Sequence, residues 1–166
     1  MDAANSERAR AGFPRQAGGF HAAKLAACIA WARSHSLQAL PFAGACCSPE
    51  MASLAGRREG GGWPGPALPH CSPRQADLLI VGGTITQRLA PVLRQVYEQL
   101  QAPRWVMAVG ACACSGAPYD NYATLPGLEA LLPVDVFVPG CPPRPEALLD
   151  GLARLQARVR SERTSR

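Results

Sequence analysis

Seven cysteines in a chain of 166 residues are the side chains whose type and spacing could do chemistry. The start of the chain lacks the charged, then apolar, then small-residue pattern of a secretory signal, so we expect a cytosolic protein with reduced thiols. Reduced thiols gathered in a small protein favour metal or redox chemistry over disulfides. The positions of the cysteines therefore carry most of the functional information.

Two of the cysteines follow apolar runs that are typical of buried strands. Cys112 comes after residues 105–109 and two small residues, and Cys141 comes after residues 134–138 and a Pro-Gly pair. If these strands are parallel, their carboxyl ends share one edge of a sheet, where the functional residues of open α/β folds gather. Both thiols then lie within reach of one bound group.

The other candidate ligands are the adjacent pair Cys46 and Cys47. Neighbouring side chains of an extended segment point apart, so both can bind one group only where the backbone is irregular. With Cys112 and Cys141 they supply four thiolates, the ligand number of a [4Fe–4S] cluster. Zinc also accepts four thiolates, but the C-x₂-C spacing of structural zinc sites does not occur in the chain.

Each cysteine also has a simpler interpretation, because free cysteine is often a buried apolar residue. An isolated Cys-Cys pair is more often core than ligand, and Cys112 alone could fill space behind its strand. Cys28 lies on the apolar side of a candidate helix and is interpreted as structural. We expect neither Cys71 nor Cys114 to bind metal, although Cys114 is near enough to Cys112 in sequence to lie beside the site.

The elements that position these cysteines alternate between strand and helix. Apolar runs predict strands at 76–81, 105–109 and 134–138, and helical spacing of apolar residues predicts helices over 20–37, 89–100 and 145–159. This alternation favours an α/β fold, a parallel sheet flanked by helices in a single domain. We expect a flexible segment at 1–19, an iron–sulfur domain at 20–158 with an irregular glycine- and proline-rich loop at 59–71, and a basic tail at 159–166.

The net charge of +5 fits nucleic acid, an anionic membrane face or an acidic partner. The arginines near the C-terminus have few aromatic residues among them, so we expect no nucleic-acid binding. The alanine-rich stretch 20–40 contains charged residues and is unsuitable as a membrane span. Any membrane contact is therefore expected to be peripheral.

Several segments resemble a known family. Residues 72–81, 83–86, 90–94 and 110–112, and above all residues 133–148 around Cys141, resemble the PSST-type (or B-type) subunit of NADH–quinone oxidoreductase, which is respiratory complex I. The resemblance covers roughly residues 31–156. It implies a flavodoxin-like fold and one [4Fe–4S] cluster, the last before quinone, held by Cys46, Cys47, Cys112 and Cys141.

The resemblance also implies a role within a complex. The chain is expected to be one subunit, not catalytic alone, of a proton-translocating NADH:quinone oxidoreductase at the cytoplasmic face of the inner (plasma) membrane. It would take electrons from an upstream iron–sulfur subunit and pass them to quinone held beside a larger neighbouring subunit. Glu50 matches the acid of the family's Cys-Cys-x-x-Glu-Met motif and would couple cluster reduction to protonation; an exposed loop acid is an equally simple interpretation. The chain lacks the spaced-glycine NAD fingerprint, so hydride chemistry belongs to a partner.

One segment departs from the family pattern. The family's Tyr-Asp-x-Asp-Arg-Phe-Gly stretch helps form the quinone pocket, whereas residues 59–64 here read Glu-Gly-Gly-Gly-Trp-Pro. Cluster binding is therefore a firmer expectation than ordinary quinone reduction. Two other functions stay open: the small subunit of a membrane-bound nickel–iron hydrogenase, although those relatives separate their first two cysteines by two residues, and a divergent paralogue that acts as a scaffold or assembly component.

Overall fold

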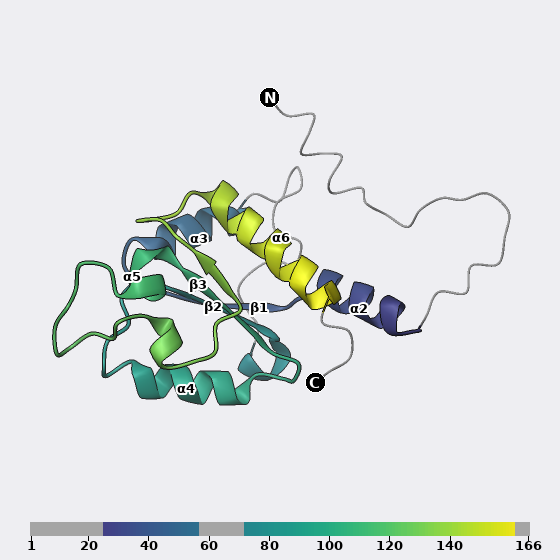
Figure 1. Ribbon diagram of the computed structural model, residues 1–166, viewed down its shortest axis with the longest axis horizontal. Coiled ribbons are helices and arrows are strands. Elements are labelled where there is room, and N and C mark those ends of the chain that lie inside the picture. The colour runs from purple at the N-terminus through teal and green to yellow at the C-terminus, as the bar shows by residue number, and fades with distance from the viewer. Residues whose placement is uncertain (1–24, 57–71, 162–166) are drawn as a thin grey trace, which may run out of the picture.

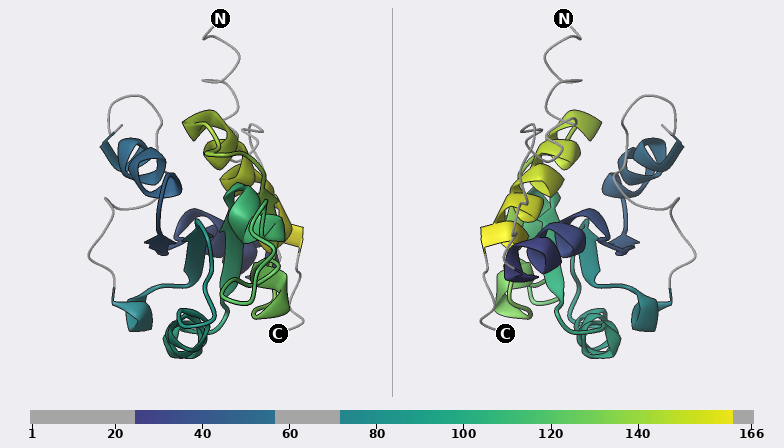
Figure 2. Two further views of the ribbon diagram at one scale, coloured as in Figure 1. Left: turned by 90° about the vertical axis from the view of Figure 1, so that its left-hand side faces the viewer. Right: turned by 90° about the vertical axis from the view of Figure 1, so that its right-hand side faces the viewer.

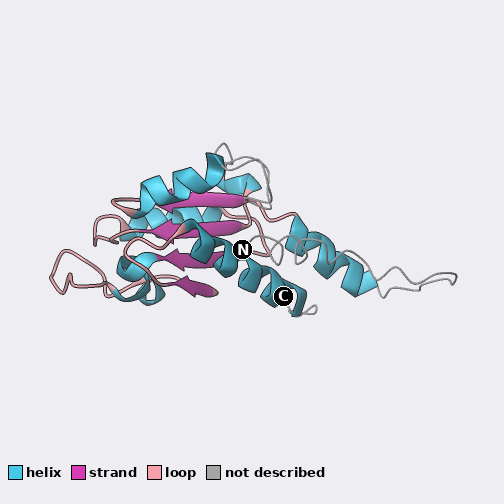
Figure 3. Cartoon of the chain, turned by 90° about the horizontal axis from the view of Figure 1, so that it is seen from above, coloured by secondary structure: helices cyan, strands magenta, loops and turns pink. Residues whose placement is uncertain are grey.

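A four-stranded parallel sheet forms the centre of the computed structural model, which describes residues 25–56 and 72–161 (Figure 1). The strands are β1 (Ala39–Ala43), β2 (Leu78–Gly82), β3 (Trp105–Val109) and β4 (Val136–Val138). They lie side by side (Figure 3), and their order in the sheet is the order in which they are named, with Ala39 beside Leu78 and Leu78 beside Trp105. All four strands therefore end at the same edge of the sheet.

Helices cover both faces of the sheet. On one face lie α3 (Cys47–Gly56) and α6 (Pro145–Ser161), and α2 (Leu25–His35) packs against α6. On the other face lies α4 (Ala90–Gln99), as the end-on views in Figure 2 show. The short helix α5 (Gly110–Ser115) continues directly from β3, and the 3₁₀ turns η1 (Pro73–Gln75) and η2 (Leu128–Ala130) complete the described elements.

The core has two layers, because alternate residues of each strand point to opposite faces. Ile80 and Met107 pack beneath α6, whereas Leu79 and Val106 pack against the α4 side. All residues of β2 and β3 are buried, as expected for the central strands of a sheet covered on both faces. The predicted fold class, a parallel α/β sheet flanked by helices in one domain, is confirmed.

The predicted strands and helices agree with the described elements to within a few residues, with three omissions. The strand β1 and the helices α3 and α5 were not predicted. The apolar side of the first helix was predicted to be buried, and this prediction is wrong. Leu25 and Ile29 on that side are 75% and 41% exposed. That helix instead faces α6 through Ser34, which is fully buried.

Hydrogen bonds fix α2 on α6. The Ser34 hydroxyl donates to the Trp31 carbonyl at 2.8 Å and accepts from Arg160 Nε at 3.1 Å. The same guanidinium lies 3.1 Å from His35 Nε2. One arginine near the end of α6 thus joins two side chains at the end of α2.

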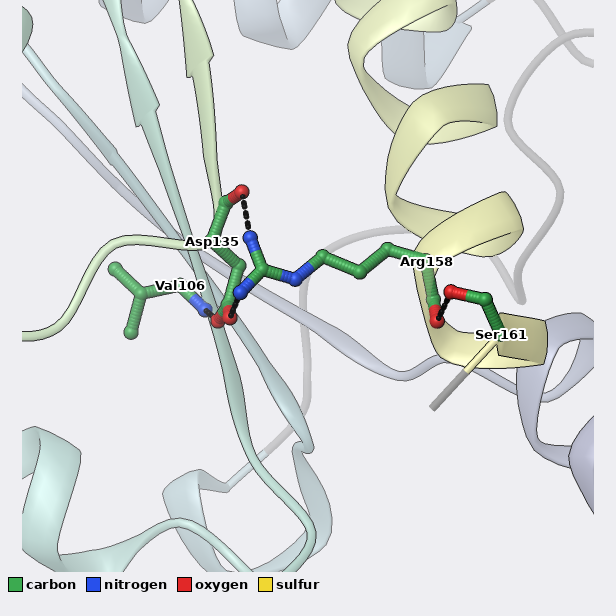
Figure 4. A network of polar contacts seen from close by, with 4 residues as sticks. All are labelled: Val106, Asp135, Arg158 and Ser161. Atoms are coloured by element: carbon green, nitrogen blue, oxygen red, sulfur yellow. Dashed lines mark hydrogen bonds and ion pairs between the residues drawn. The ribbon is translucent and has the colours of Figure 1, made fainter. Parts of the chain in front are cut away.

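Two aspartates brace the amino ends of the strands. Asp77 Oδ1 accepts the amide of Gln38 at 2.7 Å, which joins the starts of β1 and β2. Asp135 Oδ2 accepts the amide of Val106 at 2.9 Å, which does the same for β3 and β4. Arg158 of α6 donates to the Asp135 carbonyl at 2.7 Å and pairs with its carboxylate at 3.4 Å (Figure 4). The edge opposite the cysteines is therefore tied together by side chains.

Some predictions fall on residues 1–24, 57–71 and 162–166, which lie outside the described residues. They include the flexible segment 1–19, the irregular loop at 59–71 with the altered quinone segment, and most of the basic tail. These remain predictions. Among the described residues, none of the helices has both the length and the hydropathy needed to cross a membrane.

Candidate functional site

The four candidate cysteines all follow the carboxyl ends of strands. Cys46 and Cys47 come after β1, Cys112 lies in α5 immediately after β3, and Cys141 comes after β4. Because the sheet is parallel, these positions share one edge, where α3 and α5 begin (Figure 1). The expectation that Cys112 and Cys141 leave the same edge of a parallel sheet is therefore confirmed.

The backbone between β1 and α3 is irregular, as the adjacent cysteines require. Ala45 has a φ of 52°, a left-handed conformation uncommon for a residue with a side chain. The turn separates the two thiols in exposure: Cys46 is exposed, whereas Cys47, the first residue of α3, is 2% exposed. The Cys47 thiol points toward the end of β3, with Sγ 3.9 Å from the Val109 carbonyl oxygen.

Gly110 is the position where three of the loops meet. Its φ of 86° favours glycine, and a β-carbon at this position would lie 2.7 Å from Cys47 Sγ and 3.6 Å from the Gly140 carbonyl oxygen. The neighbouring amide of Ala111 donates to that carbonyl at 2.7 Å. The loops that carry Cys47, Cys112 and Cys141 are therefore held against one another at this glycine.

Burial and two neighbouring cysteines perturb the titration of the Cys47 thiol. Burial, and to a smaller extent the neighbouring Cys46 and Cys112, raise the pKa of Cys47 to about 11, against the opposing effect of a backbone hydrogen bond from Gly83. At neutral pH the Cys47 thiol keeps its proton unless a cation replaces it. Metal binding at this residue would therefore release a proton and depend on pH.

Cys141 is the fourth candidate ligand, and it follows β4 at the same edge of the sheet. It is exposed, in a loop whose preceding Gly140 adopts a φ of 149° and leaves no room for a β-carbon against Pro143. Within the described parts of the chain, no group of three histidine, cysteine or acidic side chains is arranged to hold a single metal ion. The ligands of a cube-shaped cluster bind different irons, so they surround a larger volume than the ligands of one ion.

Two of the other three cysteines, Cys28 and Cys114, lie in the described part of the chain. Cys28 is half-buried on α2. Cys71 lies outside the described residues. Cys114, in α5, has Sγ 3.7 Å from the carbonyl oxygens of both Ala108 and Val138. Burial raises the pKa of Cys114, so this thiol remains protonated at neutral pH.

Glu50 lies in the first turn of α3, the helix that begins at Cys47. Its side chain is half-buried, and its carbonyl oxygen accepts a hydrogen bond from Ser53 at 2.8 Å. The sequence interpretation of Glu50 as a loop acid missed the helix. Pro49 and Glu50 near its start are the signal that could have predicted it, since both residue types favour a first helical turn. The role of Glu50 beside a cluster stays a prediction.

Comparisons with known proteins give one family. Residues 37–155 match the family model described as NADH ubiquinone oxidoreductase, 20 Kd subunit. The chain is 49% identical over 147 residues to an NADH-quinone oxidoreductase B-type subunit of Anaeromyxobacter sp. (strain K), a match covering 89% of this chain and 81% of that protein. It is 52% identical over 149 residues to the corresponding NADH-quinone oxidoreductase chain of Flavobacterium johnsoniae, with the same two coverages.

Solved structures agree in fold. A chain of the membrane-bound sulfane sulfur reductase, an archaeal respiratory membrane complex, superposes with a TM-score of 0.70 at 32% identity, covering 82% of this chain and 77% of that one. A chain of an NAD⁺-reducing [NiFe]-hydrogenase superposes with a TM-score of 0.52 at 19% identity, covering 74% and 92% of the two chains. The second likeness concerns the fold alone.

Proposed function

Since the chain belongs to the NADH ubiquinone oxidoreductase 20 Kd subunit family, we propose that it is the electron-transfer subunit of an NADH–quinone oxidoreductase, with one [4Fe–4S] cluster on Cys46, Cys47, Cys112 and Cys141. The single observation that carries the cluster assignment is the gathering of these cysteine loops around Gly110 at one edge of the sheet. When bound, the cluster would accept and release one electron at a time.

The residues at this edge fit such a group. All four thiols are free, so none is taken up by a disulfide. The positive φ of Ala45 interrupts the extended backbone that would otherwise point the two adjacent cysteines apart, and Gly110 leaves open the space beside Cys47 Sγ that a side chain would fill. The burial of Cys47 excludes water from one side of the site, and the exposure of Cys46 and Cys141 leaves the other side open to a partner.

The proposal extends to the partners and the location. The subunit would work within a multi-subunit complex and associate peripherally with the membrane, at its cytoplasmic face. It would receive electrons from an upstream iron–sulfur subunit and pass them to quinone beside a larger neighbouring subunit. NADH oxidation would occur elsewhere in the complex, and proton translocation would belong to the assembly as a whole. The segment at 59–66, where the family pattern is replaced, lies outside the described residues.

The cluster assignment is tested by anaerobic reconstitution of the full chain. We expect about four irons and four sulfides per chain and a reduced-state electron paramagnetic resonance (EPR) signal from one cube. Single replacement by alanine of Cys46, Cys47, Cys112 or Cys141 should remove or convert the cluster, while Cys28→Ala serves as the matched control. Tightly bound zinc without sulfide would contradict the proposal.

A further inference from the structure

Cys114 stands outside the proposed ligand set, yet its thiol occupies a defined place between two strands. Its Sγ lies 3.7 Å from the carbonyl oxygen of Ala108 in β3 and 3.7 Å from that of Val138 in β4. The side chain is half-buried and packs against the apolar layer on the α4 side of the sheet. Cys114 therefore contacts both strands from within the helix that follows β3.

These two carbonyls belong to the segments that lead into the ligand loops. Ala108 lies two residues before Gly110, and Val138 lies two residues before Gly140. One step nearer the site, the amide of Ala111 donates to the Gly140 carbonyl at 2.7 Å. The thiol contacts and the Ala111–Gly140 hydrogen bond therefore connect the same two segments of the chain at neighbouring positions.

We propose that Cys114 is a positioning residue whose thiol ties the carboxyl ends of β3 and β4 and thereby sets the separation of Cys112 and Cys141. The proposal rests on the assignment of those two residues to one cluster. A thiol has a single proton, so it donates to one of the two carbonyls at a time while the other lies within reach.

A thiol hydrogen bond is weak, so Cys114 affects the geometry of the site through its position and not through the strength of the bond. Cys114 lies two residues from Cys112 in a helix of six residues, so a movement of its side chain is passed to the ligand over a short path. Binding sites depend on ligand positions held within about 0.5 Å. Loss of the thiol should consequently change the geometry of the site more than the stability of the fold.

Three substitutions separate the hydrogen bond from the volume of the side chain. Cys114→Ser keeps a donor, Cys114→Val keeps bulk without a donor, and Cys114→Ala removes both. Ser115→Ala is the matched control, because Ser115 is the next residue of the same helix, is exposed, and donates only to Ala111 within α5, at 3.2 Å.

The first measurement uses the full chain without metal. Hydrogen exchange of the Ala111 amide, followed by NMR, reports how firmly the β3 and β4 loops are held together. We expect roughly two- to fivefold faster exchange in Cys114→Val and Cys114→Ala, from the loss of one weak hydrogen bond, and exchange close to that of the unmodified chain in Cys114→Ser and Ser115→Ala. Unfolding midpoints measured in parallel identify any variant in which exchange is faster because the whole chain unfolds. If Cys114→Val does not fold, the exchange rate of Cys114→Ala alone tests the proposal.

The second measurement uses the reconstituted chain. Cys114→Val and Cys114→Ala should keep full iron and sulfide content but shift the reduced-state EPR g-values and the midpoint potential, and Cys114→Ser should restore both. Unchanged exchange and g-values in Cys114→Ala would overturn the proposal, as would a serine variant displaced as far as the alanine variant. Loss of the cluster in both Cys114→Ala and Cys114→Ser would make Cys114 a ligand instead. If the unmodified chain binds no cluster, the proposed function fails, while the exchange measurement still decides the role of Cys114.

Discussion

Replacing Gly110 by alanine tests the geometry of the cysteine edge most directly. The added β-carbon would lie 2.7 Å from Cys47 Sγ, about 0.7 Å short of ordinary contact, which begins near 3.4 Å. Cys47 is buried, so its sulfur can give way only by turning from its present direction. A displacement of this size exceeds the roughly 0.5 Å within which binding sites hold their ligands. We therefore expect Gly110→Ala to lose or convert the cluster.

The same substitution has a separate effect on folding. A residue with a β-carbon at a φ of 86° costs about 1–2 kcal/mol. For a chain of this size the melting temperature without metal should fall by roughly 2–8 °C. The assay is iron and sulfide content with EPR after anaerobic reconstitution, beside thermal unfolding of the metal-free chain. The metal-free variant should remain folded at 25 °C, so cluster loss can be separated from unfolding.

Gly44→Ala is the matched control, because a β-carbon at Gly44 would meet no atom within 4 Å. Gly44 lies in the loop before Cys46. The Gly44→Ala variant should keep the cluster, and its melting temperature should be close to that of the unmodified chain. A Gly110→Ala protein that binds four irons with an unchanged EPR signal would refute the reasoning. Equal loss of the cluster in Gly44→Ala would also refute it, because cluster loss would then not depend on a collision with Cys47.

Two further substitutions probe single carboxylates. Burial raises the pKa of Asp77 from 3.8 to about 6, so the folded state binds the extra proton between these values and its stability falls as pH rises from 4 to 6. Asp77→Asn keeps an acceptor for the Gln38 amide and removes this penalty; urea unfolding should show a gain of about 1–2 kcal/mol at pH 7, after allowance for partial exposure, and almost none at pH 4. A gain equal at both pH values would exclude the charge as its cause. Glu50→Gln should raise the midpoint potential of the cluster and flatten its pH dependence, because a nearby negative charge disfavours an added electron. Redox titrations at several pH values measure both properties. If neither the potential nor its pH dependence changes, Glu50 is an ordinary helix acid.

The sequence was most informative where burial was most complete. The strand β3 begins and ends at the predicted residues, because a continuous apolar run has few other solutions in a parallel sheet. The strand β1 was missed because Pro41 interrupts its apolar pattern. The structure explains the exception: β1 is an edge strand, paired only with β2 in the described sheet, and an edge tolerates a residue without an amide hydrogen.

The local structure around the candidate cysteines was less predictable than the sheet that carries them. The φ of Gly110, and the short distance that would separate a β-carbon at this position from Cys47 Sγ, explain why a glycine stands before the Cys112 loop. The helix α5 was not predicted, since a six-residue segment of glycine, alanine, cysteine and serine has little periodicity. The contacts of Cys114 depend on how far β4 reaches along β3, which is a property of strand register and not of local sequence.

The order of the strands in space is also their order along the chain, and this has a consequence for the time at which the site is completed. Synthesis begins at the N-terminus, so each new strand emerges to find its neighbour already made. The loops of Cys46, Cys47 and Cys112 can thus come together on β1, β2 and β3 while the ribosome is still at work. Cys141 follows β4, and α6, which packs against β4, follows Cys141. The nascent chain therefore lacks Cys141, the fourth proposed ligand, until β4 has been made, so insertion of the proposed cluster would follow the synthesis of the other three ligand loops.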